Sequence, residues 1–135
     1  MTIEPRTLVE AARSAAGRGD AIVCEGVGGL MVPLTPGYLV RDLAVDLGLP
    51  LVVAARPGLG TINHTLLTLE AARAAGLRPV AVVITPWPDA PDPMTRSNRA
   101  TIEALGGVPV HTLPQTSPDA LSEAGSALPL DELLA

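Results

Sequence analysis

The chain has 135 residues, of which 47% are hydrophobic, and carries a formal net charge of −5 at pH 7. This length and hydrophobic content predict one globular α/β domain over residues 1–135, while the acidic balance, one tyrosine and one tryptophan argue against a nucleic-acid surface. Because no apolar run reaches about 18 residues, no secretory pattern opens the sequence and only one cysteine occurs, we expect a cytoplasmic protein without a membrane span.

The first part of the chain predicts two helices and one strand. Apolar residues at helical spacing predict a helix over 7–16, and the short apolar run 21–24 predicts a buried parallel strand that contains Cys24. A glycine-rich loop and a short extended piece over 30–34 follow. Leucines at helical spacing then predict a short helix over 38–47.

The rest of the chain alternates strands and helices. The expected elements are a buried strand over 51–55, a helix over 61–75, a strand over 80–84, a proline-rich loop over 85–93, a helix over 94–105, a strand over 108–110, and helical turns near 118–124 and 130–134. Strands of continuous apolar residues that alternate with helices are typical of an α/β fold with a parallel sheet and helices on both faces.

A carboxylate and three glycines follow the first predicted strand, as Glu25, Gly26, Gly28 and Gly29. The carboxyl ends of parallel strands are where open α/β sheets bind ligands, and glycine lets the backbone approach a ligand closely. One interpretation is that Glu25 coordinates Mg²⁺ beside a phosphate. The other is an ordinary turn in which the acid caps nearby backbone.

A second pair of glycines, Gly58 and Gly60, precedes Thr61, which we expect to be the N-cap of the long helix. The unsatisfied amides of a helix start form a ready site for phosphate or carboxylate, although a plain capped helix has the same pattern. Asn63 could cap the helix or contact a ligand. His64 is more simply explained as a helix-face residue than as a catalytic one.

Two further loops follow the later strands. Residues 85–88 (Thr-Pro-Trp-Pro) and 113–115 (Leu-Pro-Gln) could line a pocket for a nucleotide base or could simply be rigid loops. All nine basic residues are arginine, so the chain contains no lysine and no Gly-x-x-x-x-Gly-Lys phosphate loop.

These segments together resemble the dethiobiotin synthases. The resemblance is carried by residues 24–33, 41–44, 47–50, 58–65 and 67–70, and its most specific part is Glu-Gly-x-Gly-Gly followed by Gly-x-Ile-Asn-His. It covers nearly the whole chain and corresponds to the C-terminal part of that family. It implies a partial P-loop NTPase-like fold, with a mostly parallel sheet flanked by helices, that lacks the phosphate-loop strand and helix.

The resemblance also implies an activity. Family members use ATP and Mg²⁺ to join CO₂ to 7,8-diaminononanoate and close a cyclic urea through a carbamic-phosphoric anhydride. By resemblance, Glu25 is a Mg²⁺ ligand, and Gly26, Val27 and Gly28 lie against nucleotide or substrate. The remaining implied contacts are Gly60, Thr61, Ile62 and Asn63 for the substrate carboxylate, and Thr85, Pro86, Pro114 and Gln115 for the base.

The chain departs from the family pattern in two ways. Thr85 stands where an asparagine commonly reads adenine, and a hydroxyl cannot offer the same pair of hydrogen bonds, so we expect other nucleoside triphosphates to be accepted. The family's lysines have no counterpart here, so we assign no catalytic residue and expect these 135 residues alone to be inactive. The missing strand predicts dimerisation, aggregation or low stability.

Alternatives to a catalytic fragment stay open. In the family the loop over residues 60–63 reaches across a homodimer, so the chain could be a non-catalytic module that dimerises and donates this loop to another subunit. It could also be a fragment of a related P-loop amidation synthetase, such as a cobyrinate synthetase, whose glutaminase domain has no counterpart in these residues. A Rossmann dehydrogenase is disfavoured because the Gly-x-Gly-x-x-Gly fingerprint does not occur.

Overall fold

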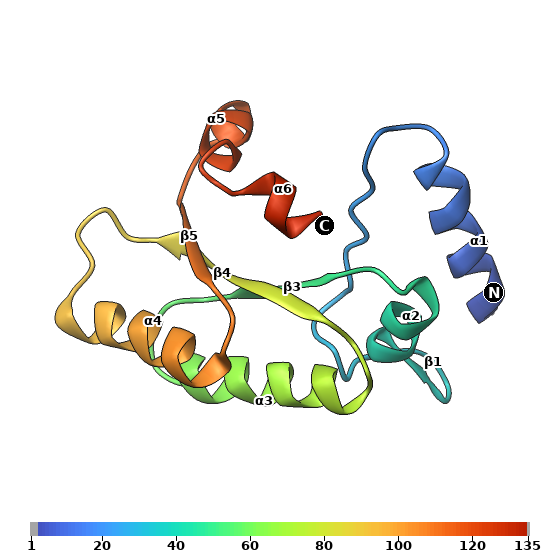
Figure 1. Cartoon of the computed structure of the whole chain (residues 1–135), viewed down its shortest axis with the longest axis horizontal. Coiled ribbons are helices and arrows are strands. Elements are labelled where there is room, and N and C mark those ends of the chain that lie inside the picture. Colours follow the sequence, from blue (N-terminus) through green and yellow to red (C-terminus); the bar gives the residue numbers. More distant parts are fainter. Residues whose placement is uncertain (1–2, 135) are drawn as a thin grey trace.

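The computed structural model describes residues 3–134 and has an α/β architecture in which helices flank a parallel sheet (Figure 1). In chain order, the described elements are α1 (Pro5–Ala16), β1 (Pro33–Thr35), β2 (Tyr38–Leu39), α2 (Val40–Leu47), β3 (Leu51–Ala55), α3 (Thr61–Ala74), β4 (Pro79–Trp87), α4 (Pro93–Gly106), β5 (Val110–Pro114), η1 (Pro118–Ala120), α5 (Leu121–Gly125) and α6 (Leu130–Leu133). Among the described residues, no helix is both long and apolar enough to cross a membrane.

The main sheet has the strand order β3-β4-β5, and all its pairs are parallel. Val53 lies opposite Val82, which in turn lies opposite Val110. Parallel neighbours need a crossover connection, and here α3 and α4 supply the two crossovers. The strands β1 and β2 form a separate antiparallel ribbon.

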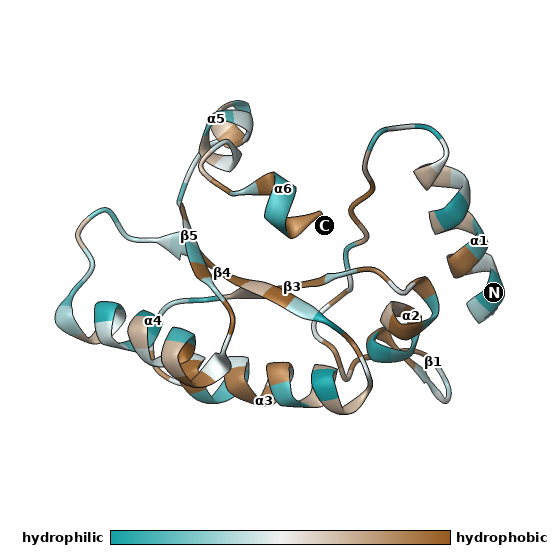
Figure 2. Ribbon diagram, viewed as in Figure 1, coloured by the Kyte–Doolittle hydropathy of each residue, from teal (hydrophilic) through white to brown (hydrophobic). Residues whose placement is uncertain are grey.

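The main core lies between the sheet and the helices α3 and α4. Its buried members are Val53, Leu69, Val82, Ile84, Ile102 and Val110. Figure 2 shows the hydrophobic residues running along these strands and on the neighbouring helices. Because truncation of a fully buried Leu or Ile to Ala typically costs about 2–5 kcal/mol, this cluster holds the three strands firmly against α3 and α4.

Capping residues define both ends of α4. The Asp92 carboxylate accepts a hydrogen bond of 2.6 Å from the Thr95 amide, and this bond holds the pKa of Asp92 below its ordinary value. Gly107 ends the helix in the left-handed region with a φ of 63°. These caps confirm a helix close to the predicted range 94–105.

The opposite face of the sheet is covered only in part. The helices α5 and α6 contact β5 and β4 respectively, and Figure 1 shows them across the sheet from α3 and α4. On β3, however, Val52 remains 39% exposed and Ala54 is also exposed. The expected helices on both faces are therefore present, but β3 is not the fully buried strand that its apolar run predicts.

The predicted buried strand over residues 21–24 is wrong. This stretch has no regular secondary structure, Val23 is 86% exposed and Cys24 is exposed rather than buried. A strand needs a neighbouring strand to pair its backbone hydrogen bonds. Among residues 3–134 the main sheet contains only β3, β4 and β5, so residues 21–24 have no strand beside them. Figure 2 shows the apolar stretch running free of the sheet.

Other boundaries differ because of pairing and capping. β4 continues to Trp87, which pairs with Pro114, so the start of the expected loop 85–93 belongs to a strand. The same pairing moves β5 from the predicted 108–110 to Val110–Pro114. The expected helix 38–47 begins only at Val40, because the Asp42 carboxylate accepts the Leu39 amide at 2.8 Å and starts the helix there.

Candidate functional site

Two of the three predicted groups of site residues lie at the carboxyl edge of the sheet. Because the strands are parallel, the chain leaves β3, β4 and β5 at the same edge. The glycine loop 58–60 follows β3. Thr85 and Pro86 lie in the last residues of β4, and Pro114 and Gln115 lie at and after the end of β5.

The glycine loop has a backbone that other residues would rarely adopt. Gly58 has a φ of 108° and Gly60 a φ of 89°. The Thr61 amide donates to the Gly58 carbonyl at 3.3 Å, and the His64 amide donates to the Gly60 carbonyl at 3.0 Å. The next two amides, of Ile62 and Asn63, have no partner in a preceding turn, so they remain as donors for an anion.

Thr61 is not the N-cap that the sequence predicts. Gly60 in its left-handed conformation takes that position, with no side-chain cap, and Thr61 becomes the first helical residue. Its side chain is 6% exposed, and its Oγ1 is buried without a hydrogen-bond partner among the described residues. Buried polar groups are nearly always paired, so this hydroxyl would gain a partner if a ligand atom reached it.

A groove of about 310 Å³ opens beside Thr61. Its walls are Val53, Ala54, Ala55, Arg56, Pro57, Leu59, Thr61, His64, Thr65 and Thr68. Arg56 contributes positive charge directly after β3, and three threonines of α3 contribute hydroxyls. A groove with one cation, several hydroxyls and the start of a long helix suits a small anionic group such as a carboxylate.

The other residues around this helix start differ in exposure. Asn63 and His64 are exposed, whereas Ile62 packs against the main core. The His64 ring lies over Gly60, because a Cβ added at Gly60 would stand 3.4 Å from the His64 Cε1. A side chain at Gly60 would touch the His64 ring, and the positive φ of this position would strain it.

A contact from α4 also reaches the glycine loop. The side-chain amide of Asn98 donates through Nδ2 to the Gly58 carbonyl at 3.3 Å. Sequence reasoning missed this residue. Its partner lies 40 positions away, so no local motif connects them.

The residues expected around a nucleotide base share one end of the sheet. Thr85 is half-buried, while Pro86, Pro114 and Gln115 are exposed. Trp87 pairs with Pro114 and packs against the main core, which ties the ends of β4 and β5 together. The indole of Trp87, the only tryptophan, therefore lies beside these positions and can report on them.

The Glu25 loop is the group that the structure does not bring to this edge. Residues 25–28 are exposed, and Gly26 lies against Val40 at the start of α2. Leu30, a little further along, packs on Ala72 and Leu77 near the end of α3. Figure 1 shows this segment near α2, whereas the loop after β3 lies at the other end of the sheet. Within residues 3–134, no group of three or more His, Cys, Asp or Glu residues could hold a metal.

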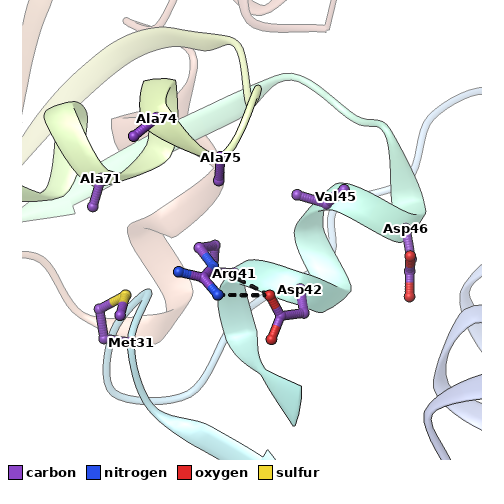
Figure 3. A pocket seen from close by; sticks show the side chains of 8 residues that line it. All are labelled: Met31, Arg41, Asp42, Val45, Asp46, Ala71, Ala74 and Ala75. Carbon is purple, nitrogen blue, oxygen red and sulfur yellow. Dashed lines mark hydrogen bonds and ion pairs between the residues drawn. The ribbon is translucent and has the colours of Figure 1, made fainter. Parts of the chain in front are cut away.

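A larger groove, of about 680 Å³, contains none of the predicted site residues (Figure 3). Its walls are Met31, Arg41, Asp42, Val45, Asp46, Ala71, Ala74 and Ala75. The Arg41 guanidinium donates to Asp42 through Nε at 3.1 Å and Nη2 at 3.0 Å. Asp42 also accepts the Leu39 amide, and these bonds, the backbone bond most of all, hold its pKa below the ordinary value. The charges of this groove thus stabilise the start of α2.

Comparison with known proteins supports the resemblance stated above. Residues 2–116 match the family model AAA_26, described as "AAA domain". Curated relatives named ATP-dependent dethiobiotin synthetase BioD come from Anaeromyxobacter sp. (strain Fw109-5), 47% identical over 100 residues, and from Mycobacterium avium (strain 104), 50% identical over 91 residues. The first match covers 74% of this chain and 45% of the relative, and the second covers 67% and 40%.

A third relative with the same name, from Bacillus thuringiensis (strain Al Hakam), is 45% identical over 67% of this chain and 38% of its own length. The chain therefore spans less than half the length of these curated relatives. The family model covers most of the chain, and the relatives confirm the resemblance drawn from the two glycine motifs. The chain thus belongs to the AAA-domain family and is a relative of the dethiobiotin synthases.

Proposed function

We propose that residues 1–135 are one α/β domain that forms the C-terminal part of a cytoplasmic, homodimeric dethiobiotin synthase and binds the carboxylate of 7,8-diaminononanoate. The observation that carries this proposal is the buried, unpartnered hydroxyl of Thr61 beside the start of α3. The curated relatives support it, since all those compared are named ATP-dependent dethiobiotin synthetases. That shared name favours this family over an amidation synthetase.

The proposed roles at the carboxylate follow from the donors present. The amides of residues 60, 62 and 63 donate to the carboxylate oxygens, while the Thr61 amide holds the turn by donating to the Gly58 carbonyl and Thr61 Oγ1 adds a hydroxyl donor. Arg56 also lines this groove and contributes positive charge. The substrate's two amines then extend away from α3, toward the place where CO₂ and nucleotide meet. In the homodimer, this loop reaches the partner's site.

The proposed nucleotide contacts form two groups: Thr85, Pro86, Pro114 and Gln115 at the carboxyl edge of the sheet for the base, and Glu25, Gly26, Val27 and Gly28, which lie apart from that edge, for the phosphates and Mg²⁺. Mg²⁺ is commonly held by one or two carboxylates together with substrate phosphates, so the exposed Glu25 carboxylate fits as one ligand. Bound Mg²⁺ would neutralise charge on the phosphoryl group that is transferred. Thr85 reads the base without an amide, and we propose that other nucleoside triphosphates are accepted beside ATP.

Carboxylate binding can be tested on the chain itself. In an NMR titration with 7,8-diaminononanoate, we expect the amides of Gly60, Thr61 and Ile62 to shift. The matched control ligand is 2,3-diaminononane, which keeps the neighbouring amines and lacks the carboxylate. Equal shifts with both ligands would show that the loop does not recognise a carboxylate.

Activity needs a second test, because the chain has no lysine for a phosphate loop. The purified chain with MgATP, bicarbonate and diaminononanoate should form no dethiobiotin. Co-expression with the N-terminal half of the Anaeromyxobacter relative should restore product, and GTP and CTP can be compared with ATP in that sample. Product from the chain alone would contradict the proposed inactivity.

The lysine-free composition also favours a second candidate, a non-catalytic module that donates its loop to another subunit. The fluorescence of the Trp87 indole distinguishes the two hypotheses, because the indole lies beside the proposed base contacts. A non-catalytic module would bind diaminononanoate and leave Trp87 fluorescence unchanged when nucleotide is added to the co-expressed sample. A synthase fragment would respond to both ligands.

A further inference from the structure

We infer that Asn98 is a positioning residue for the carboxylate site, which acts by holding the Gly58 carbonyl and with it the glycine loop at the start of α3. This inference rests on the proposed function. Asn98 lies on α4, is half-buried, and donates from Nδ2 to the Gly58 carbonyl at 3.3 Å. It touches no proposed ligand atom, so its effect passes through the loop.

Packing and capping fix the part of α4 that carries Asn98. One turn before it Thr95 is buried, and one turn after it Ile102 is fully buried in the main core. The Asp92 cap fixes the start of the same helix through the Thr95 amide. The position of Asn98 is therefore set by α4 and by the sheet on which α4 packs, and not by the loop that Asn98 contacts.

The glycine loop, in contrast, has little of its own to hold it. Gly58 and Gly60 both have positive φ values, and glycine has the largest conformational freedom of any residue. Leu59 between them is 97% exposed, so it contributes no packing. The Gly58 carbonyl accepts the Thr61 amide within the loop, and Asn98 adds a bond to that same carbonyl from outside.

The consequence for ligand binding follows from preorganisation. If the Gly58 peptide rotated, the bond from the Thr61 amide to the Gly58 carbonyl would break, and the turn before α3 would open. If the donors of a site become ordered only when the ligand binds, the free-energy cost of ordering them lowers the affinity. Loss of one neutral hydrogen bond predicts roughly a three- to tenfold weaker binding of the carboxylate.

The experiment compares two variants by the NMR titration with 7,8-diaminononanoate described above. Asn98→Leu removes the hydrogen bond without adding charge, and Asn98→Asp keeps the shape while replacing the donor by an acceptor. Both should raise the Kd three- to tenfold and broaden the Gly58 and Gly60 amide signals before ligand is added. Ser97→Ala, at the exposed neighbouring position of α4, should change neither quantity.

Each outcome separates the inference from the proposed function. An absence of shifts at Gly60, Thr61 and Ile62 in the wild-type chain would overturn the carboxylate site itself. Wild-type binding with unchanged affinity in Asn98→Leu would overturn the positioning role alone, and weakening only in Asn98→Asp would show charge repulsion instead. If both variants unfold, hydrogen exchange of the Asn98 side-chain amide in the wild-type chain provides the test. Slow exchange is expected, whereas exchange at the rate of a solvent-exposed amide would contradict the hydrogen bond to the Gly58 carbonyl.

Discussion

At the residue scale, Thr61 links the stability of the protein to its proposed ligand. A buried hydroxyl without a partner costs free energy in the unliganded protein. We expect Thr61→Val, which keeps the shape, to raise the free energy of unfolding by about 1 kcal/mol and to weaken binding of diaminononanoate. Thermal melts with and without the ligand measure both effects.

The matched control is Thr68→Val on the same helix. The Thr68 hydroxyl already donates to the His64 carbonyl at 2.8 Å, so this variant loses a hydrogen bond and should not gain stability. A lower melting temperature in Thr61→Val would mean that the hydroxyl has a partner in solution, and the site would lose its main support.

Tyr38 provides a second residue-scale prediction, through its pKa. Burial, followed by the hydrogen bond that its hydroxyl donates to Asp46 at 2.7 Å, raises the pKa of Tyr38 from 10.0 to about 12. As the pH rises, the Tyr38 hydroxyl therefore loses its proton at a lower pH in the unfolded chain than in the folded protein. The stabilising contribution is complete below pH 10.0 and is lost as the pH rises toward about 12.

Because Tyr38 is the only tyrosine, its ionisation can be followed by ultraviolet absorbance without interference from another phenol. Asp46→Asn removes the charge of the acceptor and should lower the pKa of Tyr38 toward its ordinary value. An identical titration curve in this variant would show that Asp46 has no part in the shift.

At the element scale, the contact between α3 and α4 depends on a glycine. A Cβ added at Gly106, the last residue of α4, would stand 2.9 Å from the Leu69 Cδ1, and Leu69 is fully buried. We expect Gly106→Ala to destabilise the protein by about 1–3 kcal/mol, although alanine is the better helix former. Denaturant unfolding measures the change.

Gly125 is the control for this prediction, since it is also the last residue of a helix. An added Cβ there meets no atom within 4 Å, so Gly125→Ala should be neutral or slightly stabilising. If the two variants had equal stability, the close approach of α3 and α4 would not be a constraint.

The elements themselves show why similar sequence patterns have different outcomes. The runs 21–24 and 51–55 are both short and apolar, and both predict a buried strand. Residues 51–55 form β3 because β4 lies beside them, whereas 21–24 have no strand neighbour in the described part of the chain. A strand is defined by its partner, and periodicity within one segment cannot show whether a partner exists.

At the scale of the whole molecule, the open side of β3 predicts self-association. Val52 is partly exposed on the uncovered face of this edge strand, and exposed apolar edges pair with other chains. Sedimentation of the wild-type chain should show mass that increases with concentration. Val52→Lys should shift the distribution toward monomer, because a charged side chain on an edge opposes pairing.

Leu105→Lys is the control, because it also replaces an exposed apolar side chain but lies on α4, away from β3. It should leave the mass distribution close to that of the wild type. Equal effects of the two lysine variants would point to general apolar exposure instead of the β3 edge.

Most of the candidate site could be predicted, but not its full arrangement. The sequence predicts residues 60–63 at a helix start and 85–86 after a strand, and the parallel topology places both on one edge of the sheet. Glu25 was expected after a strand too, yet its segment forms no strand and lies apart. Asn98 was missed, because a contact over 40 positions leaves no local signal.

By itself, the sequence determined most of the helices, the family, and the absence of a lysine for phosphate binding, because these depend on residue type and on spacing within one segment. Only the tertiary structure decided which apolar runs become strands, which side of β3 stays open, and that α4 holds the glycine loop through Asn98. These outcomes depend on contacts between residues far apart in the chain. Such contacts form where two segments bury apolar surface against each other and pair their hydrogen bonds, which no single segment can show.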